Sequence, residues 1–396
     1  MSRNAANGKT ITVIGGGPSG MMAAVTAARN ECTAVRLLEK NEILGRKLLA
    51  TGNGRCNLTN LNCADSADTL EFFSEIGLLT RSEGEGRVYP YSEQASAVCE
   101  VLIHTLRDLK VEVICKEVIQ SVGRQKTGFV ITTEKNQFYT DAVILATGGK
   151  AGPQYGSTGD GHRIAKQFGH TVVRTMPSLV QLVSERDFFR FLKGVRTKGQ
   201  TELLREGSVV AIENGEIQFT EDGLSGICIF NLSKYYQKGD EVRLDLLPEY
   251  DEASLLRVME QRVNSLASRS MAEFFLGMVH KKLSPVLLGE LSLDETRKIH
   301  TMTKEELTKS TRLLKGWVIP ITGTKGWKEA QVTSGGIDLS EVDLNTMESK
   351  LVPKLYFAGE LLDWDGKCGG YNLQWAWSTG KTAGRAAAEA LGDMKC

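Results

Sequence analysis

A glycine-rich turn near the start of the chain has the residue types that bind dinucleotide phosphates. The segment Gly15–Gly20 reads G-x-G-x-x-G and lies between an apolar strand and a helix. Its first glycine permits a tight turn, its second lets the backbone approach a pyrophosphate, and its third lets helix and strand pack closely. Glu39 follows at the end of the next strand, where an acid accepts hydrogen bonds from ribose hydroxyls. Strand, helix and acid together favour a dinucleotide site over a plain glycine turn with a surface glutamate.

Two later segments also run from an apolar strand into glycine. Ala142–Leu145 continues into Ala146-Thr147-Gly148, a pattern of two-dinucleotide-binding flavoproteins that any strand-to-turn junction could imitate. Leu355–Ala358 continues into Gly359-Glu360, where the acid is expected to bond a ribityl hydroxyl or a water near the pyrophosphate. The three motifs in this order favour FAD, because an NAD dehydrogenase needs only the first.

A helix that starts from about Leu373 is expected to face the flavin pyrimidine with its N-terminus. Gly369 and Gly370 precede this helix and are expected to let the backbone approach the flavin ring. Asn372 is expected at the N-cap, where its side chain can accept a bond from a backbone N–H two or three residues on. The positive end of the helix dipole would then stabilise a reduced, anionic flavin.

The elements that must position these motifs read as an α/β domain. Strand Thr10–Ile14, helix Ser19–Asn30 and strand Ala34–Leu38 form a βαβ opening. The near-continuous apolar run Asp141–Leu145 suits a sheet that is covered on both faces. A helix is also predicted at Ser92–Leu109, with strands at Val111–Val122 and Gly128–Thr133.

The pattern changes near Arg186 and changes back near Gly326. Between these points the chain shows short strands and turns, and then two helical stretches. The strands include Ser208–Ile212 and Glu216–Phe219, and the helices are Glu252–Met278 and Thr303–Leu314. We therefore expect a first part of the FAD-binding domain at 1–185, an inserted middle region at 186–325 and the rest of the FAD-binding domain at 326–396.

The composition argues against nucleic-acid binding, a membrane span, a secretory signal and a zinc site. The 396 residues carry 48 Lys+Arg and 48 Asp+Glu, so no basic excess argues for nucleic acid or for an anionic membrane surface. No apolar run approaches the roughly 18 residues of a membrane span, and the polar start Met1–Thr10 argues against a secretory signal. The eight cysteines form no CxxC pair and no zinc pattern. We expect a cytoplasmic protein with reduced thiols and no metal site.

The segment Gly45–Asn60, GRKLLATGNGRCNLTN, is long and distinctive enough to indicate a particular family. It resembles the BaiN-like flavoproteins, also called the aminoacetone-oxidase-like or YhiN-like family, whose usual pattern is close to GKKLLxSGGGRCNxTN. The closing motifs Gly359–Asp363 and Gly369–Ala376 are similar to those of the family, and so are Phe219-Thr220 and Gly223–Gly226 in the middle. The resemblance covers nearly the whole chain.

This resemblance implies a Rossmann-like FAD domain of the two-dinucleotide-binding type, with an inserted small β-barrel and a helical segment. It also implies that the Gly52–Asn57 loop lies near the flavin. The chain departs from the family at Asn53, where glycine is common, and at Cys368, where Thr or a similar residue is common. The candidate cofactor-binding residues are Gly15, Gly17, Pro18, Ser19, Gly20, Glu39, Lys40, Lys47, Leu48, Thr51, Gly52, Gly54, Arg55, Cys56, Asn57, Val118, Ala146, Thr147, Gly148, Gly359, Glu360, Gly370, Asn372 and Leu373.

No residue is assigned a catalytic role from sequence. Cys56 could act as a redox thiolate, but an active disulfide needs a close partner and Cys63 lies beyond the motif, so a small buried residue is the favoured interpretation. Arg55 is equally suited to a substrate anion, the pyrophosphate or a structural salt bridge. Tyr371 could donate a proton or simply pack. The histidines match no triad or metal pattern, and the tryptophans could line an apolar cavity or belong to the core.

The leading hypothesis is an FAD-dependent, NADH- or NADPH-linked reductase of a conjugated C=C bond in an apolar, steroid- or bile-acid-like small molecule. No second G-x-G-x-x-G is visible, so the nicotinamide would bind transiently over the flavin. A flavin amine oxidase acting on a small amine such as aminoacetone is an alternative. A flavin-bound binding or sensing protein is an alternative of another class, and balanced charge argues mildly against RNA.

Overall fold

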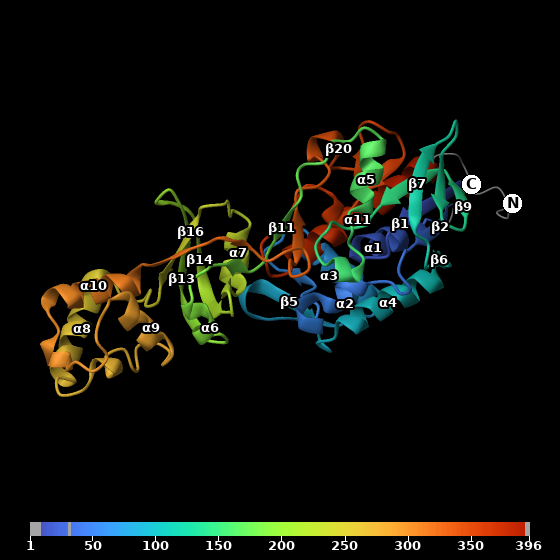
Figure 1. The fold of residues 1–396 in the computed structure, drawn as a ribbon. Coiled ribbons are helices and arrows are strands. Elements are labelled where there is room, and N and C mark those ends of the chain that lie inside the picture. Colours follow the sequence, from blue (N-terminus) through green and yellow to red (C-terminus); the bar gives the residue numbers. More distant parts are fainter. Residues whose placement is uncertain (1–8, 31–32, 393–396) are drawn as a thin grey trace. The chain divides into compact units, whose positions relative to one another are not determined.

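The computed structural model describes residues 9–30 and 33–392. The chain divides into two units, of which unit 1 contains the residues up to Pro177 and from Gln331, and unit 2 is Ser178–Ala330 (Figure 1). The boundaries expected from sequence, 185/186 and 325/326, therefore lie a few residues inside unit 2. Most of the polar N-terminal segment, Cys32 and Cys396 lie outside the described residues.

Unit 1 is built on a seven-stranded sheet. Its order is β20 (Val342–Asp343), β21 (Glu348–Ser349), β22 (Leu355–Phe357), β10 (Ala142–Leu145), β1 (Lys9–Ile14), β2 (Thr33–Leu38) and β6 (Glu112–Ile114). The five strands from β22 to β6 are parallel. Every residue of β10 and β22 is buried, because helices and loops cover both faces.

Helices α1 (Pro18–Ala28) and α11 (Tyr371–Gly392) pack closely in unit 1 because α11 has glycines, which lack a side chain, where it contacts α1. A Cβ on Gly380 would lie 2.4 Å from the Ser19 carbonyl oxygen, and one on Gly384 would lie 2.4 Å from the Ala23 carbonyl oxygen. The remaining longer helices of unit 1 are α3 (Ser66–Glu75), α4 (Ala95–Asp108) and α5 (Asp160–Gln167). Two three-stranded antiparallel sheets also belong to unit 1: β3 (Thr59–Asn60) with β5 (Arg87–Pro90) and β4 (Thr80–Ser82), and β7 (Ile119–Arg124) with β8 (Phe129–Thr133) and β9 (Gln137–Thr140).

The single strand predicted at Val111–Val122 is wrong. The segment forms β6 in the parallel sheet and β7 in a separate antiparallel sheet. Lys116, between them, has a left-handed backbone with φ of 62°, which ends an extended strand.

Unit 2 contains a second seven-stranded sheet, which is antiparallel. Its order is β17 (Trp317–Pro320), β16 (Glu241–Asp245), β13 (Arg196–Arg205), β14 (Ser208–Phe219), β15 (Gly223–Ser225), β12 (Leu182–Val183) and β18 (Gly323–Thr324). The two strands predicted at 208–212 and 216–219 are one strand, β14. The two edge strands of the sheet, β17 and β18, are only two residues apart along the chain. The sheet must therefore curl until its edges lie near each other. The described residues show no β17–β18 ladder, so closure into a barrel stays a prediction.

The helices of unit 2 cover its own core. They are α6 (Phe188–Leu192), α7 (Ile227–Ser233), α8 (Glu252–Ser265), α9 (Leu283–Glu290) and α10 (Lys304–Lys315). The single helix predicted over Glu252–Met278 is wrong, because α8 ends at Ser265. The Arg262 guanidinium in its last turn donates to the carbonyl oxygens of Phe274 and Leu276 and so holds the following irregular segment against the helix. Helix α10 begins with a capping box between Thr303 and Glu306.

Candidate flavin-binding site

The three glycine motifs predicted from sequence meet at one edge of the parallel sheet. Strand β1 lies between β2 and β10, and β10 lies between β1 and β22, so the carboxyl ends of all three motif strands lie side by side. The Ala146 N–H donates to the Ile14 carbonyl at 2.8 Å, and the Ala358 N–H donates to the Leu145 carbonyl at 2.9 Å. The chain leaves β1 toward β2 and returns on its other side as β10. This is the switch point at which open α/β sheets bind ligands.

The Gly15–Gly20 turn fits a dinucleotide phosphate. Gly15 has φ of 108°, and a Cβ there would lie 2.4 Å from the Ala146 carbonyl oxygen. A Cβ on Gly20 would lie 1.8 Å from the Gly15 carbonyl oxygen. Around Gly17, by contrast, no atom of the described residues lies within 4 Å of an added Cβ. Protein packing therefore explains the first and third glycines, and the open space at the second suits a phosphate at the N-terminus of α1, which begins at Pro18.

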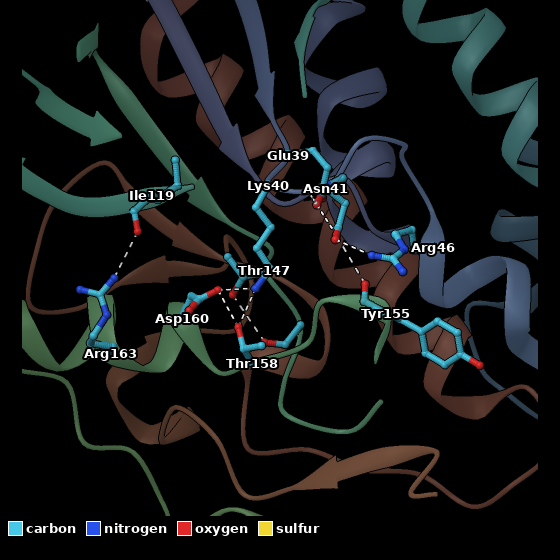
Figure 2. Close-up of polar contacts among 12 residues, drawn as sticks. Glu39, Lys40, Asn41, Arg46, Ile119, Thr147, Tyr155, Thr158, Asp160 and Arg163 are labelled. Carbon is cyan, nitrogen blue, oxygen red and sulfur yellow. Dashed lines mark hydrogen bonds and ion pairs between the residues drawn. The ribbon is translucent and has the colours of Figure 1, made fainter. Parts of the chain in front are cut away.

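Glu39 ties the second strand to this turn. Its side chain is 7% exposed, and one carboxylate oxygen accepts from the Gly16 N–H at 2.6 Å. The other oxygen accepts from the backbone N–H of Asn41 at 2.7 Å. Figure 2 shows Asn41 between Glu39 and two later residues: Arg46 donates to the Asn41 side-chain oxygen at 2.9 Å, and the Asn41 amide donates to the Tyr155 carbonyl oxygen at 3.4 Å. The Asn41 side-chain amide also donates to this second Glu39 oxygen at 2.6 Å, so three of the four acceptor positions of the carboxylate are used and one remains for a ribose hydroxyl.

Lys40 faces an acid that sequence reasoning missed. Its ammonium group donates to the Thr158 hydroxyl at 2.6 Å and forms an ion pair with Asp160 at 2.5 Å (Figure 2). Burial raises the pKa of Asp160, but hydrogen bonds from Lys40 and Thr158 outweigh it and hold that pKa below its ordinary value. Asp160 is the first residue of α5, within Thr158-Gly159-Asp160-Gly161. A glycine-flanked acid at a helix start was the signal available in the sequence.

Lys47 and Glu360 are 313 positions apart and form an ion pair at 2.7 Å. Lys47 lies in α2 (Arg46–Ala50), next to the buried Leu48, and Glu360 lies in the short helix η7 (Gly359–Leu361). The second Glu360 oxygen accepts from the backbone N–H of Thr333 at 2.8 Å. Thr333, also missed from sequence, accepts from the Lys150 and Ala151 N–H groups through its hydroxyl, at 2.7 and 2.9 Å. The acid of the third motif is therefore held rigidly beside β10.

The loop after α2 is held in left-handed conformations. Gly52, Asn53, Gly54 and Cys56 have φ of 58°, 56°, 86° and 60°. Asparagine enters this region more readily than most residues with a side chain, which explains how Asn53 replaces the family's glycine. Thr51 donates its hydroxyl to the Leu48 carbonyl at 2.6 Å and so ties the loop to α2.

Arg55 and Cys56 have structural partners. The Arg55 guanidinium forms ion pairs with Glu83 at 2.5 Å and Glu93 at 3.2 Å, and it lies 4.2 Å from the centroid of the Tyr89 ring. The structural salt bridge, one of the alternatives for Arg55, is thus present. Cys56 is fully buried, and burial raises the pKa of its thiol to about 12. At neutral pH it is a thiol and a poor nucleophile.

The expected N-cap role of Asn372 is wrong. Helix α11 begins at Tyr371, so Asn372 lies inside its first turn. Its side-chain oxygen accepts from the Gly366 N–H at 2.9 Å, and its amide donates to the carbonyl oxygens of Gly366 and Lys367 at 3.1 and 3.2 Å. Asn372 therefore fixes the preceding loop. Gly370, with φ of 100°, is required locally because a Cβ would lie 2.4 Å from the Thr59 carbonyl oxygen.

The start of α11 also contacts the early motif. In the amide orientation that satisfies both partners, Asn57 donates to the Thr59 carbonyl and accepts from the Gly370 N–H, each at 3.2 Å. Leu373 is partly buried against the core of unit 1. The Gly45–Asn60 and Gly369–Ala376 motifs, far apart in sequence, therefore lie together.

The other predicted residues lie around the same edge. Ser19 is buried beneath Gly359, where an added Cβ would lie 2.5 Å from the serine hydroxyl, and Thr147 and Gly148 follow β10 directly. Val118 is 43% exposed and follows Glu117, whose N–H donates to the Glu39 carbonyl at 3.0 Å.

Four of the five tryptophans fall into two groups. Trp317 and Trp377 are fully buried core residues. Trp364 and Trp375 stack at 4.7 Å with an interplanar angle of 20°, and Trp375 donates to the Gly359 carbonyl at 3.2 Å. This partly exposed pair lies beside the third motif. Across residues 9–30 and 33–392 no cluster of metal-ligating side chains is found.

Comparison with known proteins agrees with this geometry. The model of the HI0933-like protein Rossmann domain matches residues 9–68 and 61–386. The chain is 40% identical to a 3-dehydro-bile acid delta(4,6)-reductase of Clostridium scindens, over 96% of this chain and 99% of the relative. It is 29% identical to a ribosomal RNA dihydrouridine synthase of Escherichia coli, over 93% and 95% of the two chains.

Solved structures share the fold. An open conformation of a flavocytochrome c3 fumarate reductase matches with a TM-score of 0.50 and 14% identity, covering 98% of this chain and 80% of that one. The 3-ketosteroid delta1-dehydrogenase of Sterolibacterium denitrificans matches with a TM-score of 0.50 and 13% identity, covering 96% and 100%. In the part of the chain that is described, no helix has the length and apolar character to cross a membrane.

Proposed function

Because the chain belongs to the HI0933-like Rossmann family, we propose that it is an FAD-dependent reductase of a C=C bond conjugated to a carbonyl group. The observation that carries the proposal is the meeting of three glycine motifs at the switch point of the parallel sheet, with open space at Gly17. FAD, when bound, supplies the ring that carries the hydride.

Residues at the carboxyl edge of the parallel sheet suit the successive parts of FAD, from the adenosine half to the flavin ring. The N–H groups at the start of α1 would bind the pyrophosphate, and Glu39 would bind the ribose of the adenosine half. Glu360, held by Lys47 and the Thr333 N–H, would face the ribityl side. The N-terminus of α11 would lie near the flavin ring and stabilise negative charge on it.

The names of the relatives support the type of reaction. A 3-dehydro-bile acid with delta(4,6) bonds has double bonds conjugated to a ketone, and a dihydrouridine arises when the C=C bond of uridine, also conjugated to a carbonyl, is reduced. In both cases a hydride adds to a carbon that conjugation with the carbonyl makes electrophilic, at the β position or, in a dienone, at the δ position, and a proton adds to another carbon of the conjugated system. This shared step favours reduction over amine oxidation, the remaining alternative.

We place an apolar, steroid- or bile-acid-like substrate first because the bile acid reductase is the more similar relative, at 40% against 29% identity. NADH or NADPH would supply the hydride, and the reaction would take place in the cytoplasm. Uridine in ribosomal RNA is the second candidate, favoured by the full-length similarity to the dihydrouridine synthase. The zero net charge of the chain argues against a large RNA interface.

Reoxidation of the reduced flavin tests the proposal. The FAD-loaded protein is reduced with dithionite without oxygen, and a steroid 4-en-3-one, a 4,6-dien-3-one or ribosomal RNA is added. Aminoacetone, which would donate electrons, is mixed with the oxidised protein instead, where an amine oxidase would bleach the flavin. We expect an enone to restore the oxidised flavin spectrum and to gain two mass units. Reoxidation by RNA alone would replace the steroid-like substrate with uridine. A flavin that neither enone nor RNA reoxidises would refute the reductase proposal.

Unit 2 is proposed to carry substrate selectivity, because all three cofactor motifs belong to unit 1. A chimera in which residues 178–330 come from a relative with another substrate should load FAD and take that relative's substrate. A folded, FAD-loaded chimera with unchanged substrate choice would contradict this role.

A further inference from the structure

Unit 1 contains a cavity of about 770 Å³ with an unusual concentration of positive charge. Four of its ten lining residues are basic, none is acidic, and none belongs to the candidate flavin-binding set. The basic residues are Lys150, Arg163, Lys166 and Arg174. In a chain with zero net charge, such a cluster attracts anions.

Two of the four basic residues of this cavity, Lys166 and Arg174, have no acid partner among the described residues. Arg163 donates to the carbonyl oxygens of Gln120 and Ile119 at 2.9 and 3.2 Å, and the contact with Ile119 is visible in Figure 2. These acceptors hold the guanidinium in place, and the Asp160 carboxylate interacts with it electrostatically. Lys166 and Arg174 are exposed, and within residues 9–30 and 33–392 neither forms an ion pair. The cavity is therefore prepared for a ligand with more than one negative charge.

His162 adds a different kind of group to the same cavity. It is 4% exposed, and its Nε2 lies 3.1 Å from the Leu361 carbonyl oxygen. A carbonyl only accepts, so Nε2 carries the hydrogen. Burial lowers the pKa of His162, so the ring is neutral and Nδ1 has a free lone pair. No hydrogen-bond partner for Nδ1 exists among the described residues. A buried acceptor without a partner costs stability. Nδ1 has less than 1 Å² of accessible surface, so a ligand hydroxyl would remove that cost only after the side chains over the ring move aside.

A ligand that satisfies both features has phosphate groups for the cations and a hydroxyl for Nδ1, as a phosphorylated ribose does. We propose that this cavity binds the phosphorylated adenosine half of NADPH, an inference that rests on the proposed reductase function, since the flavin needs a hydride donor. A cavity of this volume is in the range of small-molecule sites. Arginine commonly accommodates the 2′-phosphate that distinguishes NADPH from NADH.

The cavity adjoins the third flavin motif through the backbone. His162 bonds the carbonyl of Leu361, the residue after Glu360. Lys150 follows Gly149, where an added Cβ would lie 3.0 Å from a Glu360 carboxylate oxygen. A dinucleotide held here by its adenosine half therefore starts next to the segments that would hold the flavin. This position explains how the chain could use NADPH without a second G-x-G-x-x-G turn.

Direct binding of a probe without a nicotinamide tests the site. The FAD-loaded protein is titrated with adenosine 2′,5′-bisphosphate in a calorimeter. We expect saturable binding that weakens at least tenfold in Lys166→Glu and in Arg174→Glu, because each reverses one charge of the cavity. Lys126→Glu is the matched control, since Lys126 is an exposed lysine in the β7–β8 turn and does not line the cavity. It should bind the probe within twofold of the unchanged protein.

Three outcomes would overturn the assignment. In the first, the bisphosphate does not bind the unchanged protein. In the second, both charge-reversed variants bind it as well as the control variant does. In the third, a single-stranded RNA oligomer binds and loses affinity in the two variants, while the bisphosphate does not bind, which assigns the cavity to RNA. If the dithionite-reduced protein still reduces an enone in any of these cases, only the cavity assignment fails. If the bisphosphate binds as expected and neither enone nor RNA reoxidises the flavin, the reductase proposal fails and the nucleotide site stands.

Discussion

Replacing Gly17 by alanine should separate cofactor binding from folding. Gly17 has φ of −81° and ψ of −173°, which any residue adopts, and an added Cβ meets no described atom within 4 Å. We therefore expect the free energy of unfolding of the Gly17→Ala apoprotein to stay within about 0.5 kcal/mol of the unchanged protein. The new methyl group would occupy the space through which a phosphate reaches the N–H groups at the start of α1. Each charge-assisted hydrogen bond lost there costs about 1.5–3 kcal/mol.

A loss of about 2.7 kcal/mol corresponds to a hundredfold weaker affinity for FAD. The affinity is measured by titrating apoprotein with FAD and following flavin fluorescence, and stability is measured by urea unfolding of the apoprotein. Gly20→Ala is the matched comparison, because its Cβ would lie 1.8 Å from the Gly15 carbonyl oxygen. It should lower the free energy of unfolding by about 1–3 kcal/mol or more. A Gly17→Ala protein that folds normally and binds FAD with unchanged affinity would refute the placement of the phosphate.

Three further predictions concern other residues. Cys56→Ser should keep FAD and most of the turnover, because the buried thiol is protonated at neutral pH; a hundredfold lower kcat with FAD retained would restore a redox role. Asn372→Ala should free the 366–367 loop and lower Tm by about 2–4 °C per kcal/mol lost, because the side-chain bonds to Gly366 and Lys367 disappear; an unchanged Tm would mean that these bonds do not stabilise the protein. The Arg297 guanidinium and the Thr303 N–H lower the pKa of Glu306 from 4.5 to about 2, so its stabilising effect is complete above pH 4.5 and is lost as pH falls toward 2. Glu306→Gln should lower Tm at pH 7 and make Tm depend less on pH between 5 and 2, and an unchanged acid dependence of Tm would contradict this assignment.

The elements that carry the cofactor motifs could be predicted because each motif is local. Gly15, Gly17 and Gly20 have distinct roles that follow from spacing alone, and the structure brings them to the carboxyl end of β1. Two predictions, the strand at Val111–Val122 and the N-cap at Asn372, were wrong because of single backbone positions. The left-handed Lys116 divides a segment that has the composition of one strand. Asn372 lies inside a helix that starts at Tyr371, before the residue that composition favoured as its cap.

Partners distant in sequence could not be read from a single chain. The ion pair of Lys40 with Asp160 and that of Lys47 with Glu360 depend on which strands neighbour each other, and spacing along the chain does not determine this. The same is true of Arg55, whose acids come from the 83–93 segment. The basic cavity is also a property of the folded chain, since its charges come from separate segments around residues 150, 163 and 174.

The order of strands in unit 1 has a consequence for synthesis on the ribosome. Strand β22 completes the parallel sheet beside β10, and α11 packs against α1, so the first and last parts of unit 1 need each other. Unit 2 is continuous in sequence and emerges whole before β22 is made. Domains generally fold as they leave the ribosome. Unit 2 should thus reach its native state first, while β1, β2 and β10 wait with an exposed sheet edge. During that interval the nascent chain is vulnerable to aggregation and cannot yet retain its cofactor.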